Sequence, residues 1–213
     1  MFSLHQPQPD RIRHLLESAR DLPLNYGMPF VTQAEFNSGE DFAAPKLPLG
    51  FVRDHTRSEI GHGESAFNAA KAAFRRWQQF DLGWVRVPNP EVAIDPDQAV
   101  AVEAHTFGLW SLNISRILYV IDEEDRFGFG YGTTPLHVES GEERFLLEFY
   151  PVSGIVFYDL LAVSRPAHWL ARLGYPITRS QQRRFARDSH RRMHLAASGS
   201  EAPKNPFADT LKS

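Results

Sequence analysis

FGFGYGTTPLHVESGEERF, residues 127–145, is the stretch of sequence that decides the fold. Its first residues alternate between glycine (Gly128, Gly130, Gly132) and the larger side chains of Phe127, Phe129, Tyr131 and Thr133. Successive side chains of a strand point to opposite faces, so this alternation predicts a strand with one bare face and one aromatic face. A bare strand face lets a helix or a ligand approach closely, or lets the sheet bend.

A nucleotide-binding loop and a metal site are two other interpretations of the same stretch. The dinucleotide fingerprint G-x-G-x-x-G stands between a strand and a helix, whereas here the spacing is G-x-G-x-G and another strand pattern follows. His137 and the glutamates at 139, 142 and 143 are possible metal ligands. They cross a predicted hairpin turn at Ser140–Gly141, and charged groups beside a hairpin commonly protect sheet edges. We therefore predict no phosphate loop, no metal and no cofactor.

The period-two pattern continues on both sides of the opening stretch. Short clusters of proline, glycine, asparagine and aspartate separate its strand candidates. The connections are too short for crossover helices, so the sheet should be antiparallel. The strand candidates are residues 51–58, 84–87, 92–94, 99–106, 114–122, 127–134, 142–150 and 155–164.

Helical patterns flank this run of strands. One apolar face starts near Asp10, a second helix opens the segment 61–80, and a last helix covers residues 177–197. The last helix carries an arginine at every fourth position from Arg179 to Arg191. Such a ridge is typical of a solvated face, with an acidic partner as the alternative, and it lacks the aromatic residues of a single-strand-binding surface. Nucleic acid is therefore an unlikely partner.

Composition sets the outer limits. The chain has 213 residues, 42% of them hydrophobic, with a formal net charge of −3 and no cysteine. The lack of cysteine excludes a disulfide scaffold and a cysteine nucleophile. No apolar run approaches the ~20 residues of a membrane span, and the first residues do not resemble a signal peptide, so a cytoplasmic protein is the expectation. We expect an N-terminal helix and irregular extension (1–50), one folded domain (51–197) and a disordered tail (198–213), with the oligomeric state left open.

A family resemblance appears at YGTTPLHVESGEERF, residues 131–145, and in three further segments. These are LPLGFVRD (47–54), IGHGESAFNAAKAAFRRWQQFDLGWV (60–85) and SRPAHWLARLGYPITRSQQRRF (164–185). With them the chain resembles, over residues 22–194, a bacterial and plant family filed as domain of unknown function nineteen-ninety. Residues 134, 136 and 138 depart from the family pattern, which affects the shape of the loop there.

The resemblance implies the helix-grip fold of the START and Bet v 1 superfamily. This is an α+β fold in which a curved antiparallel sheet of about six to seven strands packs on a long C-terminal helix. The gap between sheet and helix often holds an apolar ligand, so the expected function is binding of a small hydrophobic, lipid-like molecule. The residues expected to contact it are Gly128, Gly130, Tyr131, Gly132, Thr133, His137, Glu142 and Arg144.

Two other functions stay open at this point. One is an enzyme in the same gap, with His137 and either Glu142 or Glu143 as acid and base, although no catalytic residue is assigned. The other is an interaction protein that uses the basic last helix.

Overall fold

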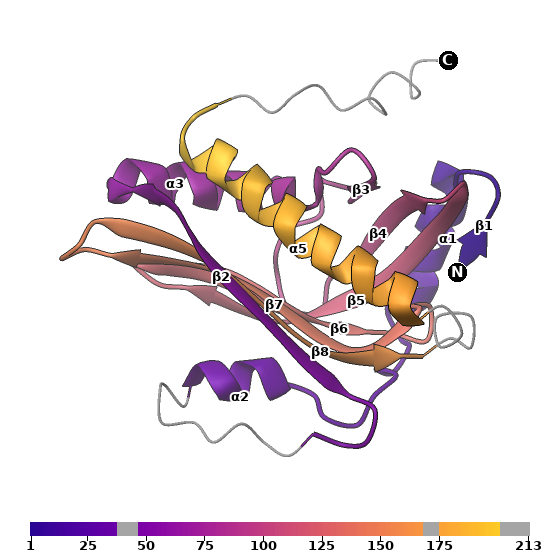
Figure 1. Cartoon of the computed structure of the whole chain (residues 1–213). Coiled ribbons are helices and arrows are strands. Elements are labelled where there is room, and N and C mark those ends of the chain that lie inside the picture. Colours follow the sequence, from indigo (N-terminus) through magenta and orange to yellow (C-terminus); the bar gives the residue numbers. More distant parts are fainter. Residues whose placement is uncertain (38–46, 168–174, 201–213) are drawn as a thin grey trace.

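The computed structural model describes residues 1–37, 47–167 and 175–200 of the 213-residue chain. Its centre is a curved sheet with the strand order β2-β8-β7-β6-β5-β4-β3, and β1 pairs with β5 (Figure 1). The strands are β1 (Phe2–Ser3), β2 (Val52–His62), β3 (Val85–Arg86), β4 (Ala99–Thr106), β5 (Leu109–Asp122), β6 (Arg126–Thr133), β7 (Glu139–Tyr150) and β8 (Ile155–Pro166).

The long C-terminal helix α5 crosses one face of this sheet together with α3, while α2 lies beneath the opposite face (Figure 1). The helices are α1 (Pro9–Ala19), α2 (Val31–Asn37), α3 (Gly63–Phe74), the 3₁₀ turn η2 (Gln78–Phe80) and α5 (Tyr175–Ala197). Every strand pair is antiparallel. The predicted helix-grip arrangement is therefore confirmed. None of the described helices is both long and apolar enough to cross a bilayer.

The hairpin between β6 and β7 differs from the sequence prediction. The predicted turn at Ser140–Gly141 is wrong, because both residues belong to β7. The chain reverses at residues 134–138, where the backbone N–H of His137 donates to the carbonyl of Thr134. Pro135 occupies the second position of this turn, where its fixed φ is favourable.

Several other elements also differ from their predicted bounds: β2 extends to His62, β5 begins at Leu109 and β7 begins at Glu139. Residues 92–94 form no strand. The helix α3 ends at Phe74 because Trp77 takes a left-handed φ of +57°, which a helix cannot continue through. The sequence also predicts a hairpin turn at a second serine–glycine pair, Ser153–Gly154, and this turn is confirmed, with Gly154 at φ +72°. The sequence also predicts a short helical turn at residues 168–173, closed by Gly174 and Pro176. That segment and most of the predicted tail lie outside the described residues, and the predicted division at residue 50 stays a prediction.

Aromatic rings pack between the sheet and α3. Phe74 of α3 meets the edges of Phe129 and Tyr158 at ring-centroid distances of 6.1 and 5.6 Å. Phe145 of β7 stacks on Phe129, 5.2 Å away. Such pairs stabilise the fold by about 0.5–1.5 kcal/mol each beyond the area that they bury. The aromatic face that the alternation of residues 127–133 predicts is therefore the face toward α5.

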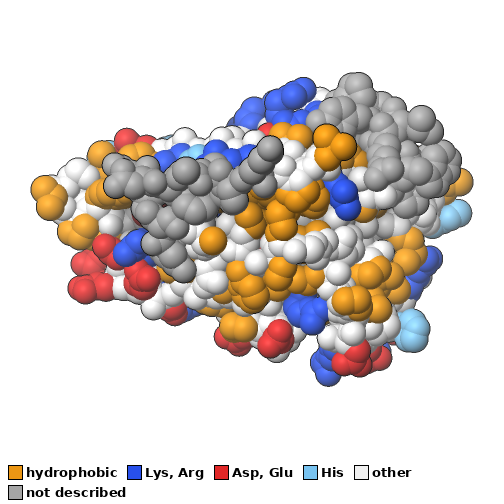
Figure 2. All heavy atoms as spheres, turned by 90° about the horizontal axis from the view of Figure 1, so that it is seen from below, with side chains coloured by type: hydrophobic (Ala, Val, Ile, Leu, Met, Phe, Trp, Pro, Cys, Tyr) orange, Lys and Arg blue, Asp and Glu red, His pale blue; other side chains and the backbone are white. Residues whose placement is uncertain are grey.

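The other face of the sheet is covered by the N-terminal part of the chain. The α1 residues Ile12 and Ala19 pack with Leu112 and Ile114 of β5. Further along, α2 lies against β7 and β8. Figure 2 shows the molecule from this side, with hydrophobic side chains in several separate groups between charged ones. We call this side the outer face and the side toward α5 the inner face.

Candidate functional site

A tyrosine–glutamate pair interrupts the aromatic inner face. Tyr131 of β6 stands opposite Glu143 of β7 in the register. The Tyr131 hydroxyl donates to Oε2 of Glu143 at 2.6 Å. The ring of Tyr131 lies 5.6 Å from that of Phe145, so the carboxyl sits at the end of an aromatic wall.

The surroundings of this pair change the acidity of both groups. Burial raises the pKa of Glu143 to about 7, the negative charges of Glu139 and Asp54 act in the same direction, and the hydrogen bond from Tyr131 opposes them. Burial, together with the charge of Glu143, holds the pKa of Tyr131 well above its ordinary value. Near neutral pH the glutamate therefore exists in both protonation states, while the tyrosine stays a phenol.

A second, partly buried carboxyl connects α5 to the sheet beside this pair. Glu139 accepts hydrogen bonds from Gln182 of α5 at 2.6 Å and from Ser164 of β8 at 3.1 Å. Burial raises its pKa as well. Gln182 also accepts from Arg179, which forms an ion pair with Asp54 of β2. These contacts fix the first described turns of α5 over the inner face.

One buried hydroxyl on the same face is unsatisfied. Ser115 of β5 stands opposite Thr133, is fully buried, and among the described residues its Oγ has no hydrogen-bond partner. Since Ile117, two residues on, belongs to the inner core, Ser115 faces the same side. An unsatisfied buried hydroxyl costs about 1–3 kcal/mol, so it indicates a position where water or a ligand supplies the partner.

Some apolar side chains of the inner core are only partly buried. Helix α5 rests mainly on α3, η2, β2 and β8. On the β3–β4 side of the sheet several hydrophobic residues pack on the core without being fully covered. They are Leu82, Trp84, Val102 and Ala104, with Phe185 of α5. The arrangement has an apolar wall, a titrating carboxyl and two hydroxyls, which are the features of a small-molecule site.

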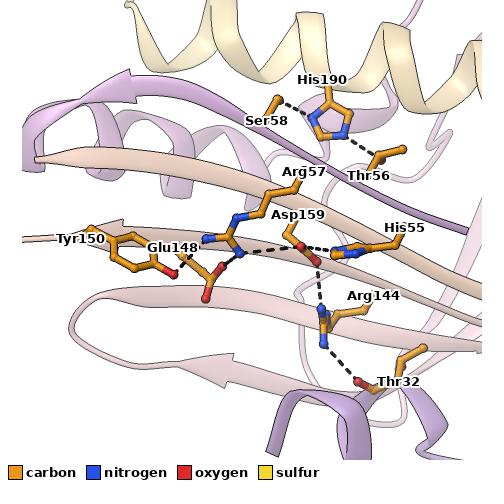
Figure 3. A network of polar contacts seen from close by, with 10 residues as sticks. All are labelled: Thr32, His55, Thr56, Arg57, Ser58, Arg144, Glu148, Tyr150, Asp159 and His190. Carbon is orange, nitrogen blue, oxygen red and sulfur yellow. Dashed lines mark hydrogen bonds and ion pairs between the residues drawn. The ribbon is translucent and has the colours of Figure 1, made fainter. Parts of the chain in front are cut away.

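A separate network of charges lies on the outer face (Figure 3). At its centre the buried Asp159 accepts from Arg144 at 2.8 Å and lies 2.5 Å from Nε2 of His55. Burial opposes the ionisation of Asp159, but the hydrogen bonds from His55 and Arg144 outweigh it and lower the pKa of the carboxyl. Arg57 connects Asp159 to Glu148 at the edge of the network. The Asp159 charge is thus paired and structural.

The same face holds the N-terminal segment in place through Glu142. Its carboxylate accepts from the Tyr26 hydroxyl at 2.7 Å and from both the backbone N–H and the hydroxyl of Thr32, at 3.1 and 2.9 Å. Arg144 donates to the carbonyl of Thr32 at 3.2 Å. Glu142 and Arg144 therefore anchor the start of α2 to the sheet.

The residues expected to contact a ligand do not converge on one site. Tyr131 and Thr133 share the inner side, whereas Glu142 and Arg144 belong to the outer network. The predicted glycines also face outward, since a side chain at Gly130 would meet the ring of Tyr119, one at Gly132 the hydroxyl of Tyr26, and one at Gly128 the backbone of β7. The bare glycine face thus meets neighbouring residues of this chain rather than α5, and a ligand-binding role for these residues stays a prediction.

His137 lies in the turn between β6 and β7. Its Nδ1 accepts from the backbone N–H of Glu139 at 2.9 Å, and burial lowers its pKa to about 3. The imidazole is therefore neutral near pH 7, and the carboxylate of Glu142 is occupied by Tyr26 and Thr32. Within the described parts of the chain, no cluster of three or more histidine, aspartate or glutamate side chains could hold a metal ion.

The titration of Glu143 gives a first testable prediction. The unfolded carboxyl has the ordinary pKa of 4.5, below the folded value of about 7. As the pH rises from 4.5 to 7 the unfolded chain releases this proton first, so the contribution of Glu143 to stability is full below pH 4.5 and is lost by pH 7. We expect this loss to be on the order of 3 kcal/mol and Glu143→Gln to abolish it.

Urea unfolding at a series of pH values measures this effect. Glu91→Gln, which changes an exposed carboxyl, is the control and should keep the wild-type slope. If Glu143→Gln kept it too, another group would be responsible for the titration.

Comparison with known proteins gives one family and one fold. The family model described as Domain of unknown function (DUF1990) matches residues 36–192. A UPF0548 protein of Dictyostelium discoideum is 34% identical over 211 residues, which cover 94% of this chain and 97% of the relative. A UPF0548 protein of Deinococcus radiodurans is 35% identical over 210 residues, with 93% and 100% covered.

A similar solved structure is the hypothetical protein jhp0584 from Helicobacter pylori. The TM-score is 0.50 at 12% sequence identity, and the match covers 72% of this chain and 90% of that one. At this identity the similarity concerns the fold alone.

Proposed function

The chain belongs to the DUF1990 family, a domain of unknown function, and we propose that it binds a small hydrophobic, lipid-like ligand between the curved sheet and α5. The cytoplasm is the proposed location. The ligand's apolar part lies along the partly exposed residues of β4 and α5, and its polar end meets the Tyr131–Glu143 pair. In this proposal Thr133 and Ser115 border the polar end, and no cofactor takes part.

The position of Glu143 carries the proposal. A carboxyl is seldom placed at the end of an aromatic wall, because burial penalises its charge. Among the described residues, Tyr131 is the only one whose side chain donates a hydrogen bond to Glu143. With a pKa of about 7 it can both donate and accept, which suits a ligand that carries a hydroxyl or an amine.

Native mass spectrometry of the gently purified full chain tests the proposal. We expect a bound small molecule, or uptake from a panel of fatty acids, sterols and long-chain alcohols and amines. Glu143→Gln should weaken the retention of ligands with a polar head by about tenfold, since a charge-assisted hydrogen bond is replaced by a neutral one. Glu148→Gln, on the outer face, should bind as the wild type does. A protein that stays empty against the whole panel would refute the proposal.

The basic last helix has less free charge than its sequence indicates. Arg179 pairs with Asp54, and Arg184 and Arg187 both pair with Asp188. Because much of the ridge is compensated within the chain, we do not propose an acidic partner for it.

A further inference from the structure

An exposed apolar patch lies at one end of the sheet, where β1 meets the hairpin between β4 and β5. Phe2 of β1 stands opposite Ser111 of β5, which brings the two segments side by side (Figure 1). We call this surface the hairpin patch. Its exposed side chains are Met1, Phe2, Leu4, Phe107 and Leu109.

Phe107 occupies the tip of the hairpin at a conformational cost. Thr106 pairs with Leu109, so the turn consists of Phe107 and Gly108, with φ values of +52° and +76°. A turn with two positive φ values favours asparagine and glycine, and a bulky side chain rarely adopts it. The ring is 79% exposed, so it gains no packing in return. An aromatic residue that is strained and unpacked indicates a contact outside the chain.

The hairpin patch is continuous with the proposed ligand site. Along the inner side of β4, Val100 is fully buried, Val102 and Ala104 are partly exposed, and Phe107 at the tip is exposed. Apolar side chains therefore follow the inner side of β4 from the interior to Ala104, and only Thr106 separates them from the tip. Trp84, another partly exposed apolar residue, lies beside β4, because its backbone carbonyl accepts a hydrogen bond from the N–H of His105.

Basic side chains of α1 stand beside the patch. Arg11 lies against Met1, with its guanidinium 2.8 Å from the thioether sulfur. Arg13 and His14 are exposed on the same helix, although Arg13 also pairs with Asp10 at 3.5 Å. Apolar side chains flanked by arginine are the combination that binds an anionic membrane surface.

We propose that the hairpin patch docks on the surface of an anionic lipid bilayer, with Phe107 and Leu4 inserted among the headgroups. Leu4 is 75% exposed and projects from the same end as Phe107. A protruding tip with few contact residues suits a soft bilayer better than a protein, which needs a broad complementary surface. The proposal rests on the patch itself. It extends the proposed ligand binding, because docking there would bring the protein to a source of hydrophobic molecules.

Sedimentation of the full chain with vesicles tests this proposal. The vesicles are an equimolar mixture of phosphatidylcholine and phosphatidylserine, compared with phosphatidylcholine alone. Phe107→Asn is the informative variant, because asparagine suits the turn and preserves the fold while removing the apolar tip. We expect it to lower the partition coefficient at least about tenfold. Val152→Ser is the matched control, since Val152 is fully exposed in the β7–β8 turn at the opposite end of the sheet.

Three results would overturn the proposal: wild-type binding to the phosphatidylserine vesicles that is no stronger than to phosphatidylcholine alone, equal binding by Phe107→Asn, or an equal loss in Val152→Ser. Concentration-dependent dimerisation that Phe107→Asn abolishes would instead assign the patch to a second copy of the chain. Ligand loading, measured by native mass spectrometry on Phe107→Asn without vesicles, should remain at the wild-type level. The two proposals can therefore fail separately.

Discussion

Asp159→Ala is expected to lower the free energy of unfolding by about 3 to 5 kcal/mol, because it removes the buried carboxylate with which the buried Arg144 forms an ion pair. Arg144, which is buried, donates to Asp159 at 2.8 Å. Arg144 also donates to the carbonyl of Thr32 at 3.2 Å (Figure 3). Removing the carboxylate also releases His55 and weakens the position of Arg57. Chemical unfolding at neutral pH, where Asp159 is ionised, measures the loss.

A double-mutant cycle with Arg144→Met separates the ion pair from other effects of the substitution. Each single variant should be strongly destabilised, whereas the double variant should lose clearly less than the sum of the two, since it leaves no unpaired charge behind. Asp122→Ala is the control, because the Lys71–Asp122 pair is half-exposed and should contribute at most about 1 kcal/mol. Additive single losses would mean that Asp159 and Arg144 are not energetically coupled.

The predictable part of this fold is the part encoded by local periodicity. The alternation of residues 127–133 predicts β6, and the strand is confirmed at Arg126–Thr133. Likewise, the strand predicted at residues 99–106 is confirmed as β4 without a shift. In both strands side chains on opposite faces meet different environments, so the sequence carries a period of two.

The Tyr131–Glu143 pair shows where local reasoning fails. In a hairpin the position of the turn fixes which residues stand opposite each other. With the turn placed at Ser140–Gly141 these two residues do not pair, whereas the observed turn at 134–138 brings them together. Pro135 is the signal in the sequence for the observed turn, whereas the serine–glycine pair at 140–141 favours the turn that does not form.

The outer network could not be predicted from neighbouring residues at all. Glu142 meets Tyr26 and Thr32, 116 and 110 positions earlier in the chain. No periodic pattern links residues so far apart, and the irregular segment before α2 has no register that would place them. The predicted site consequently combined residues of the hairpin that the strand pleat separates onto two faces.

Gly141→Ala should be the most damaging small substitution in the opening stretch, with a loss of at least about 3 kcal/mol. A Cβ at this position would lie 2.0 Å from the carbonyl oxygen of Val163 and 2.7 Å from Cα of Ser164. Both are backbone atoms of β8, so relief requires moving one strand against the other. The φ of +153° adds strain for any side chain. This glycine therefore serves the close approach of β7 and β8 and not a turn.

Thermal and urea unfolding of three alanine variants test this interpretation, because the three are expected to lose stability by different amounts. Gly27→Ala is the control, since its Cβ would meet no atom within 4 Å, and it should change stability by less than about 0.5 kcal/mol. Gly130→Ala should fall between the two, because its Cβ meets the ring of Tyr119, a side chain that can move at the expense of its hydrogen bond to Thr32. A Gly141→Ala protein as stable as Gly27→Ala would mean that β7 and β8 can separate without cost, which the buried pairing on both sides of Gly141 argues against.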